Sequence, residues 1–388
     1  MKSQTDRKLL LILPTSFLMS FAIGVVNLGM LFVVKEDYHA SPAAVGWFAA
    51  LWSMAYLAGC LSLRVLYKYV KASISMTIAC LGSALLFVVH IVFPGLISAF
   101  IVYGLYGFIT AFFWPRVMGW VSSGVEGAAL GKASGLFNVA WSTGGIIAPF
   151  AGGLLSERST FLPIWVGIAI FCLAGLFVLV MSRFAPSPSL KPDKQVVEND
   201  EIKKDTSTVL RYPAWVGIFL LYALIAVFFN IFPLYAKDEL GLSESRIGLI
   251  LLVRALATSI GFWFFGRFGF WHFRRKMLFL PVLLTLALDL AFIFIRSPLL
   301  LGIGVGVAGF LLAAAYSASM FYGASGALDR ERRMTAHESS LTAGQILGSI
   351  LGGAVYQSLS WASVFTVLAF LLAAGAATQL FMLGRGKR

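Results

Sequence analysis

The sequence predicts an all-α integral membrane protein with twelve transmembrane helices arranged as two six-helix bundles. Of its 388 residues 59% are hydrophobic and 12% are charged, and the mean hydropathy is +0.88. Soluble domains carry about a quarter of their residues as charged side chains. The chain also contains long apolar runs without strand-like alternation, and its two halves repeat one another. Because lipid offers peptide groups no hydrogen-bond partners, each run is expected to be a helix.

The apolar runs are long enough to cross a bilayer, which needs roughly 20 mostly apolar residues per helix. The first run follows Lys2, Arg7 and Lys8, but it is too long for a signal peptide and lacks a small-residue cleavage site, so it is expected to be the first helix. The twelve runs lie at 9–34, 45–66, 73–94, 97–121, 134–155, 160–182, 213–236, 246–266, 277–295, 298–323, 335–358 and 361–384.

The positions of lysine and arginine predict the orientation, since cytoplasmic loops retain positive charge. With the N-terminus inside, the outside segments hold Lys35, Arg158, Lys237, Arg246 and Arg296, whereas most of the other cations fall in inside segments. Both termini are therefore expected to be cytoplasmic. The formal net charge of +13 follows from this topology and requires no nucleic-acid partner.

The three cysteines, Cys60, Cys80 and Cys172, all lie in apolar runs. They form no disulfide framework and no metal-binding spacing, so no metal and no cofactor is expected. Gly304, Gly306 and Gly309 match a dinucleotide fingerprint, but they lie inside a predicted helix instead of a strand–turn–helix unit. Without a nucleotide site, a pump driven by ATP has no support.

A mixed-charge segment at 183–211, rich in proline and serine, interrupts the apolar pattern and is typical of a flexible cytoplasmic linker. It predicts an N-terminal bundle at 1–182 and a C-terminal bundle at 212–388.

The two halves are related in sequence. KEDYHASPAAVG at 35–46 matches KDELGLSESRIG at 237–248 with an offset of 202, which Gly59 and Gly261 also keep. GGIIAPFAGG at 144–153 has its counterpart, GQILGSILGG, at 344–353. Such spacing predicts duplication, with the halves related by an axis along the membrane normal.

Six plus six helices, a charged central segment and both termini inside resemble the major facilitator superfamily (MFS) of secondary transporters over nearly the whole chain. The resemblance departs in two motifs. The loop after the second helix keeps Gly59 and Arg64 but has Leu63 where the family has an aspartate. The fourth helix keeps the spacing of Gly107 but has Tyr103 where drug antiporters have an arginine, which weakens the case for proton antiport.

Glycine-rich faces occur on the fifth and eleventh helices. In the fifth they resemble a family motif typical of exporters and antiporters, and small residues at every fourth position let two backbones approach closely in lipid. Ordinary helix packing is the alternative and would explain a single such face, but the matched pair with Pro149 favours a sliding seam between the halves. Leucine at Gly152 or Gly348 is therefore expected to leave a folded protein that transports poorly. The seam residues are Gly144, Pro149, Gly152, Gly153, Gly344, Gly348, Gly352 and Gly353.

Ionisable residues inside the membrane are costly and are functional candidates by default. Arg254 and Asp289 lie at similar depth and are expected to form either a structural salt bridge, the favoured interpretation, or a proton or substrate site. Glu338, at the start of the eleventh helix, is a coupling candidate or a partner of the basic loop before it. Arg116 is a further coupling candidate, or a residue that extends to the cytoplasmic surface.

Family cavities are formed largely by the first, fourth, seventh and tenth helices. By this resemblance, the candidate substrate-binding residues are Asn27, Trp114, Asn230 and Tyr316, with Trp141 from the fifth helix. Aromatic walls with few charges suit an amphipathic or weakly polar solute.

These features predict a secondary transporter, and no enzyme, that moves a small organic solute by alternating access. Export is favoured, with proton coupling left open. The alternatives are an importer of the same fold and a transporter-like receptor or scaffold that does not transport. The expected partners are a small-molecule substrate, the lipid bilayer and, if coupling exists, protons. The chain is expected to act as a monomer in the cell membrane, that is, a bacterial inner or plasma membrane.

Overall fold

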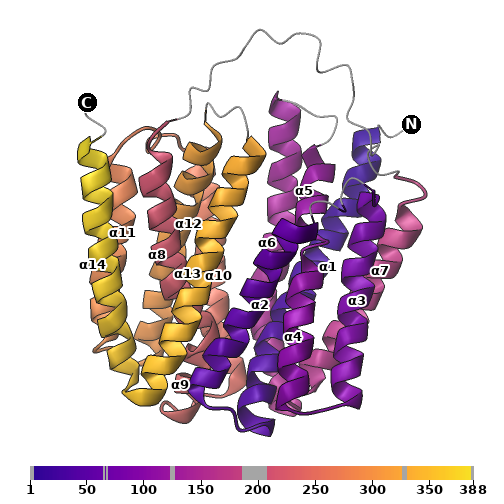
Figure 1. The fold of residues 1–388 in the computed structure, drawn as a ribbon, viewed down its shortest axis with the longest axis horizontal. Coiled ribbons are helices and arrows are strands. Elements are labelled where there is room, and N and C mark those ends of the chain that lie inside the picture. Colours follow the sequence, from indigo (N-terminus) through magenta and orange to yellow (C-terminus); the bar gives the residue numbers. More distant parts are fainter. Residues whose placement is uncertain are drawn as a thin grey trace. The chain divides into compact units, whose positions relative to one another are not determined.

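The computed structural model describes residues 4–63, 66, 69–122, 127–185, 208–325 and 330–385. All regular structure in these ranges is helical (Figure 1), and each predicted apolar run corresponds to one helix or to two consecutive ones. The helices are α1 (Gln4–Phe32), α2 (Pro42–Ser62), α3 (Ala72–Val92), α4 (Leu96–Thr110), α5 (Trp114–Ser122), α6 (Gly127–Arg158), α7 (Leu162–Met181), α8 (Arg211–Asn230), α9 (Phe232–Asp238), α10 (Glu244–Arg267), α11 (Lys276–Phe292), α12 (Pro298–Ala324), α13 (Arg330–Ser358) and α14 (Trp361–Arg385), with a π-helical turn, η1 (Val33–Asp37), after α1.

Ten helical segments of the described ranges are long and apolar enough to cross a membrane by themselves. Two of the predicted spans do not reach this length and hydropathy. α11 has 17 residues, and α13 begins with the polar stretch RERRMTAHESS. Both pack against α14, and α13 also packs closely against α8, so tertiary contacts support these two segments. The predicted twelve-helix fold is confirmed, whereas the orientation of the termini stays a prediction.

Two of the predicted spans are interrupted near a proline. α4 ends at Thr110, and α5 begins at Trp114 with Pro115 as its second residue. In the same way α8 ends at Asn230, and α9 begins at Phe232 with Pro233 second. Proline has no amide hydrogen and fits the first turn of a helix, so each proline starts a new helix where it would disrupt a continuing one.

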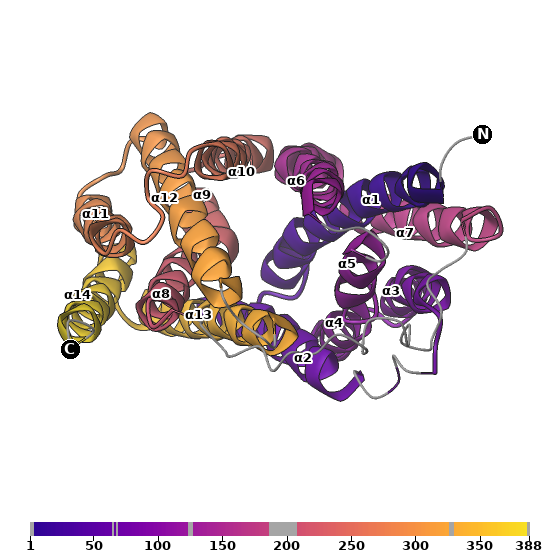
Figure 2. The same ribbon diagram turned by 90° about the horizontal axis from the view of Figure 1, so that it is seen from above.

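The described residues form two compact units. Unit 1 comprises Met1–Ala40, Leu51–Val196 and Ser243–Leu249, and unit 2 comprises Ser41–Ala50, Val197–Leu242 and Ile250–Arg388. In unit 1, α1 packs against α6 and α7, and α3 packs against α4 and α7. In unit 2, α8 packs against α12, α13 and α14, while α11 packs against α12 and α14 (Figure 2). Most of the predicted linker at 183–211 lies outside the described residues, so its boundaries stay a prediction.

The internal repeat reappears as equivalent helix contacts. A Cβ atom built on Gly59 would lie 2.8 Å from Cβ of Ala111, and one on Gly261 would lie 2.6 Å from Cβ of Ala313. Both pairs keep the offset of 202. Glycine at the two equivalent positions therefore lets α2 approach α4, and α10 approach α12, more closely than any other residue would allow.

Five of the eight predicted seam residues contact the first helix of their own half instead of a seam between halves. The glycine face of α6 packs on α1, and the glycine face of α13 packs on α8. The two faces are separated by 200 residues in the sequence. Gly144 lies on the backbone of Phe17 and Gly152 beside Val25 in α1, while Gly344 lies on Phe219, Gly348 on Ala223 and Gly352 on Val227 in α8. These contacts favour ordinary packing within a bundle for the five glycines, and a role in a seam stays a prediction.

The other three seam residues contact the starts of α2 and α10. In unit 1, Gly153 lies against Glu244, and the carbonyl of Pro149 lies against Gly248. In unit 2, Gly353 lies against Pro42 and Gly46. The start of α10 thus packs on α6 within unit 1, and the start of α2 packs on α13 within unit 2.

A side chain caps each of these helix starts. Oε1 of Glu157 accepts a hydrogen bond from the backbone amide of Ser245 at 3.1 Å. Oε1 of Gln357 accepts one from the amide of Ala43, also at 3.1 Å. The first amides of a helix have no partner within it, so these two side chains satisfy otherwise free donors.

The glycine contacts predict unequal effects of alanine on stability. A Cβ atom at Gly348 would lie 2.7 Å from the carbonyl carbon of Ala223, and backbone cannot move aside, so Gly348→Ala should destabilise the protein by about 1–3 kcal/mol. At Gly152 the nearest atom would lie 3.4 Å away, so Gly152→Ala should leave stability unchanged or raise it slightly. Thermal unfolding of the purified variants distinguishes the two, and equal shifts would refute this packing scheme.

Candidate functional site

A cluster of polar and aromatic side chains lies within unit 2, where α8, α10, α12 and α13 each contribute. Arg254, from α10, places its guanidinium carbon 4.7 Å from the ring centroid of Phe229 in α8. Its charge also acts on the hydroxyl of Tyr222, one of two tyrosines in the cluster. Arg254 is therefore held by a cation–π contact and a nearby phenol, without a carboxylate partner among the described residues.

Glu338 of α13 is the acidic member of the cluster. It lies close enough to Tyr222 and Tyr316 to interact electrostatically with both phenols. Tyr222 also interacts electrostatically with Arg254, so this phenol is coupled to both the acid and the base. Such a set can accept a cation at Glu338, an anion at Arg254, and hydrogen bonds at either tyrosine. We call Arg254, Tyr222, Tyr316 and Glu338 the polar cluster.

Aromatic rings frame the side of the polar cluster formed by Tyr316. The ring of Phe262 lies 5.1 Å from that of Tyr316, and the ring of His337 lies 4.7 Å from it, nearly perpendicular. Nδ1 of His337 shares a hydrogen bond with Oγ of Ser319 at 2.7 Å, which fixes the imidazole. The phenol of Tyr316 is thereby held in one orientation by its neighbours from α10 and α13.

Helical spacing explains why Tyr222, and not the predicted residue of the same helix, contributes to the polar cluster. Tyr222 and Phe229 are seven residues apart and so share one face of α8. The predicted residue of this helix, Asn230, lies on the next face. It is buried and donates from Nδ2 to Oγ of Ser349 in α13 at 2.8 Å. Asn230 therefore ties α8 to α13, and Tyr222 replaces it as the polar residue of this helix in the cluster.

Unit 1 contains a second aromatic group, which joins two predicted residues. The ring centroids of Trp114 in α5 and Trp141 in α6 are 6.4 Å apart, and Phe137 lies 6.4 Å from Trp114. In the same unit, α2 holds a stacked pair, Trp52 and Tyr56, with centroids 5.3 Å apart. The structure thus brings two of the separately predicted residues, Trp114 and Trp141, into an edge-to-face contact.

Asn27 of α1 is half-buried and has an unused acceptor. Its Oδ1 atom is buried and has no hydrogen-bond partner among the described residues. A buried amide oxygen without a donor is costly, and such groups mark places where a ligand or water completes the bonding. This observation keeps Asn27 among the binding candidates.

Arg116 lies apart from the polar cluster. It belongs to unit 1, at the start of α5, and its Nη2 donates to the carbonyl of Val70 just before α3 begins. The side chain therefore satisfies an exposed carbonyl between two helices, which favours the structural alternative over a coupling role.

The expected salt bridge between Arg254 and Asp289 is not present. Asp289, in α11, is fully buried, and neither of its carboxyl oxygens has a hydrogen-bond partner in the part of the chain that the structure describes. Arg254 instead lies against α8, where it makes a cation–π contact with Phe229 and interacts electrostatically with Tyr222. The prediction was wrong because similar depth in the membrane says nothing about the direction that each helix face takes.

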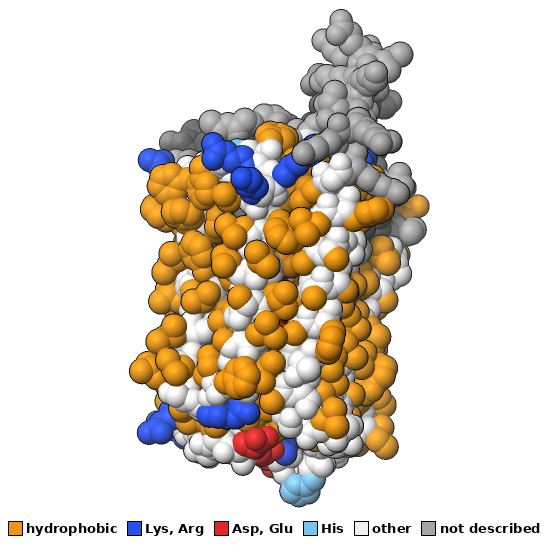
Figure 3. All heavy atoms as spheres, turned by 90° about the vertical axis from the view of Figure 1, so that its left-hand side faces the viewer, with side chains coloured by type: hydrophobic (Ala, Val, Ile, Leu, Met, Phe, Trp, Pro, Cys, Tyr) orange, Lys and Arg blue, Asp and Glu red, His pale blue; other side chains and the backbone are white. Residues whose placement is uncertain are grey.

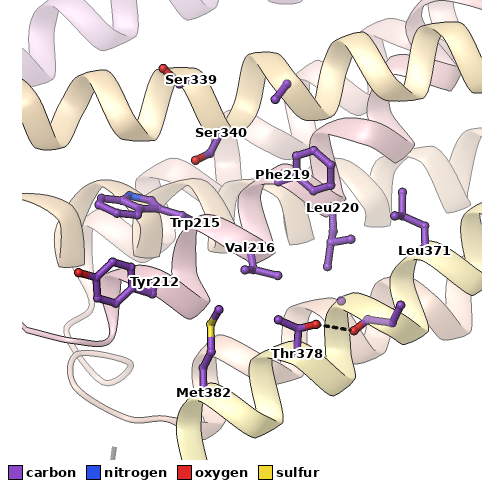
Figure 4. Close-up of a pocket in the computed structure, with 13 residues that line it drawn as sticks. Tyr212, Trp215, Val216, Phe219, Leu220, Ser339, Ser340, Leu371, Thr378 and Met382 are labelled. Carbon is purple, nitrogen blue, oxygen red and sulfur yellow. Dashed lines mark hydrogen bonds between the residues drawn. The ribbon is translucent and has the colours of Figure 1, made fainter.

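Metal-binding groups of three or more His, Cys, Asp or Glu side chains do not occur among the described residues. A groove of about 670 Å³ does occur on unit 2, between α8, α13 and α14 (Figure 4). Its walls include Phe219, Leu220 and Leu371, with Tyr212 and Trp215 at one end (Figure 4). None of the predicted binding residues lines it, so the groove is separate from the polar cluster.

Exchanging the two charges tests the absence of the salt bridge. The double variant Arg254→Asp with Asp289→Arg should yield no more folded protein than the worse single variant, because the arginine introduced into α11 would be buried without a partner. Asp289→Asn, which is neutral and of equal size, should fold normally. Gel filtration of the detergent-purified variants measures the folded yield, and recovery of the natural yield in the double variant would show that the two side chains pair after all.

Comparison with known proteins agrees with this architecture. Solved structures of similar fold include a bacterial homologue of the human lysosomal transporter Spinster, captured inward-facing and unoccupied, with a TM-score of 0.76, 12% identity, and coverage of 98% of this chain and 97% of the other. A point mutant of the nucleoside transporter NupG gives a TM-score of 0.67 and 15% identity, over 97% of this chain and 99% of the other. A point mutant of the peptide transporter POT, in complex with sulfate, gives 0.75 and 12%, over 97% and 94%.

A curated relative supports the same family. Multidrug resistance protein 1 of Bacillus subtilis (strain 168) is 29% identical over 193 residues, a match that spans about half of each protein, 47% of this chain and 48% of the relative. The sequence profile of the Major Facilitator Superfamily matches residues 12–328 and 214–387, which together cover nearly the whole chain. With its helical fold and its two units of equivalent packing, the chain belongs to the Major Facilitator Superfamily of membrane transporters.

Proposed function

We propose that the protein is a secondary transporter that exports a small amphipathic organic solute by alternating access. The observation that carries the proposal is the polar cluster of unit 2, in which an acid, a base and two phenols lie together on membrane-spanning helices. Buried charges are costly in this setting and persist where they serve binding or coupling. A solute with an apolar body and one or two polar groups matches this chemistry.

The aromatic side chains supply the apolar part of the proposed site. Phe229 and Phe262 border the polar cluster in unit 2, and Trp114 and Trp141 form an aromatic pair in unit 1. Flat rings provide large contact areas for little conformational entropy, and their faces attract cations. Asn27, with its free Oδ1, adds a hydrogen-bond acceptor for a donor on the solute.

Two observations favour export over import. The fifth helix carries a glycine and proline pattern that resembles the exporter motif, at Gly144, Pro149, Gly152 and Gly153. A relative that matches over about half of its length is named a multidrug resistance protein. The solved neighbours transport different solutes by name, so they favour no direction. Import, and a receptor or scaffold that does not transport, are the alternatives.

Glu338 is the proposed coupling residue. It faces two phenols, and a carboxyl group in such surroundings changes its interactions with both when it gains or loses a proton. Arg254 interacts electrostatically with Tyr222 and would respond to that change through the phenol. Asp289 is buried elsewhere in unit 2, without a hydrogen-bond partner among the described residues, and Arg116 is engaged in unit 1, so neither takes part in this proposed relay.

The proposed moving seam consists of Pro149, Gly153 and Gly353 with the helix starts that they contact. Close backbone approach without side chains between two helices permits sliding, because no interlocking side chain must be displaced. The caps from Glu157 and Gln357 would be made and broken as the helix starts move.

Solute transport in reconstituted vesicles tests the function directly. A panel of amphipathic organic solutes is offered with and without a pH gradient. Solute movement that accelerates with the gradient supports proton-coupled transport, and movement indifferent to the gradient eliminates the coupling. If no solute moves although the protein is folded and inserted, the receptor or scaffold becomes the better explanation.

Glu338→Gln isolates the coupling step. The substitution keeps the size of the side chain but removes its charge change, so transport driven by a pH gradient should fall about tenfold or more while facilitated exchange of solute persists. Asp37→Asn, at an exposed position after α1, is the matched control and should transport normally. Loss of both activities in Glu338→Gln would assign the residue to solute binding instead.

Gly153→Ala probes the seam. A Cβ atom there would lie 2.8 Å from the carbonyl carbon of Glu244, so the turnover rate should fall several-fold as α10 is displaced. Gly145→Ala, eight residues earlier on α6, meets its nearest atom, Oγ of Ser20, at 3.4 Å and serves as the control. Equal turnover in the two variants, measured in the same vesicles, would remove the seam from the mechanism.

A further inference from the structure

The segment between α10 and α11 exposes both phenylalanine and cationic side chains. We call residues 267–276, RFGFWHFRRK, the aromatic-basic loop. Phe268, Phe270 and Phe273 are 45%, 41% and 57% exposed. Three large apolar side chains within six residues of one connecting loop make an apolar patch that water would solvate poorly.

Three of the four cations of the loop are without a partner among the described residues, whereas Arg275 donates from Nη1 to the carbonyl of Leu383 at 2.8 Å. Arg267, Arg274 and Lys276 are exposed, and their side chains make no hydrogen bond or ion pair with any described residue. Between Glu244 and Asp289 the sequence contains no acidic residue. The loop is therefore a concentrated positive surface whose partner must bring negative charge.

Other residues hold the loop rigidly in this arrangement. Trp271 is buried, and its Nε1 donates to the carbonyl of Phe265 at 3.0 Å. The hydroxyl of Tyr322 in α12 donates to the carbonyl of Trp271 at 3.1 Å. His272 stacks on Phe321 with ring centroids 4.0 Å apart. With its backbone pinned to α10 and α12, the loop presents its exposed side chains without first having to become ordered.

Phe273 adopts a strained backbone conformation. Its φ of 54° lies in the left-handed region, which costs a residue with a Cβ atom about 1–2 kcal/mol. The same residue exposes the largest fraction of its ring among the three phenylalanines of the loop. The ring contacts Phe321 and Tyr322 of α12, with centroids 5.5 and 5.8 Å apart, yet more than half of the residue stays exposed and open to an apolar partner outside the chain.

We propose that the aromatic-basic loop is a docking surface for anionic phospholipid headgroups of the adjoining leaflet. The loop follows the span Glu244–Arg267, so it emerges at a bilayer surface. There the rings can enter the upper acyl region while the three cations bind phosphate groups. Figure 3 shows lysine and arginine side chains at both ends of a face that hydrophobic side chains otherwise cover. A second copy of the chain fits less well, because two identical cationic loops repel each other.

Phe273→Asn separates lipid binding from a role in folding. Asparagine tolerates a positive φ, which offsets the loss of the ring contacts with Phe321 and Tyr322, so in detergent the variant should unfold close to the temperature of the natural protein. In nanodiscs containing phosphatidylglycerol it should gain less stability, because the ring that enters the leaflet is gone. A lower unfolding temperature in detergent and nanodiscs alike would show that the ring is structural and would overturn the proposal.

Charge removal tests the headgroup contact. The triple variant Arg267→Gln, Arg274→Gln, Lys276→Gln should need about tenfold or more phosphatidylglycerol for half-maximal stabilisation, and should behave like the natural protein in pure phosphatidylcholine nanodiscs. The matched control replaces three exposed cations elsewhere, Arg158, Arg246 and Arg296, by glutamine and should keep the natural response. An unchanged response in the loop variant overturns the proposal, as does a change in oligomeric state with no change in lipid response, which would identify a second copy as the occupant.

Discussion

Direct contact between helix backbones is the interaction on which this structure depends. Lipid is as apolar as leucine, so burying apolar side chains between two spanning helices gains little, and close packing must supply the attraction. Gly344 and Gly348 bring α13 onto the backbone of α8, and Gly144 brings α6 onto that of α1. Each bundle is thus assembled around its first helix, and the positions of the remaining helices, including those that carry the polar cluster, follow from these contacts.

The number, order and approximate limits of the helices could be predicted because they depend on local composition, and the duplication could be predicted because it is written as a repeat. What could not be derived from the sequence alone is the direction of each helix face. Asn230 and Phe229 are neighbours, yet one bonds to Ser349 within the bundle and the other meets Arg254. The glycine faces of the fifth and eleventh predicted helices can also be recognised in the sequence. Whether such a face packs on the first helix of its half or forms a seam depends on which helix lies opposite, and the sequence does not give that.

The polar cluster shows how the same fold can hold charge inside a membrane without an ion pair. Arg254 is accommodated by a ring face and a phenol, which lower the cost of its charge while leaving its donors available. A tight salt bridge would instead fix both side chains, and it would have to break each time a solute binds. Weak, multiple contacts suit a site that must release what it binds. Tyr222 interacts electrostatically with both Glu338 and Arg254, so the acid and the base can influence each other through this phenol.

The starts of α2 and α10 each pack in the unit that is formed mainly by the other half of the sequence, and this limits the order in which the chain can fold. Unit 1 includes Ser243–Leu249, which the ribosome delivers after six helices and the linker have already been made. Until then the end of α6 around Gly153 has no partner, and the turn at Ser41–Ala50 must wait for α13. Each unit can therefore complete its packing only after segments from both halves of the sequence have been synthesised, so its final stability is gained late.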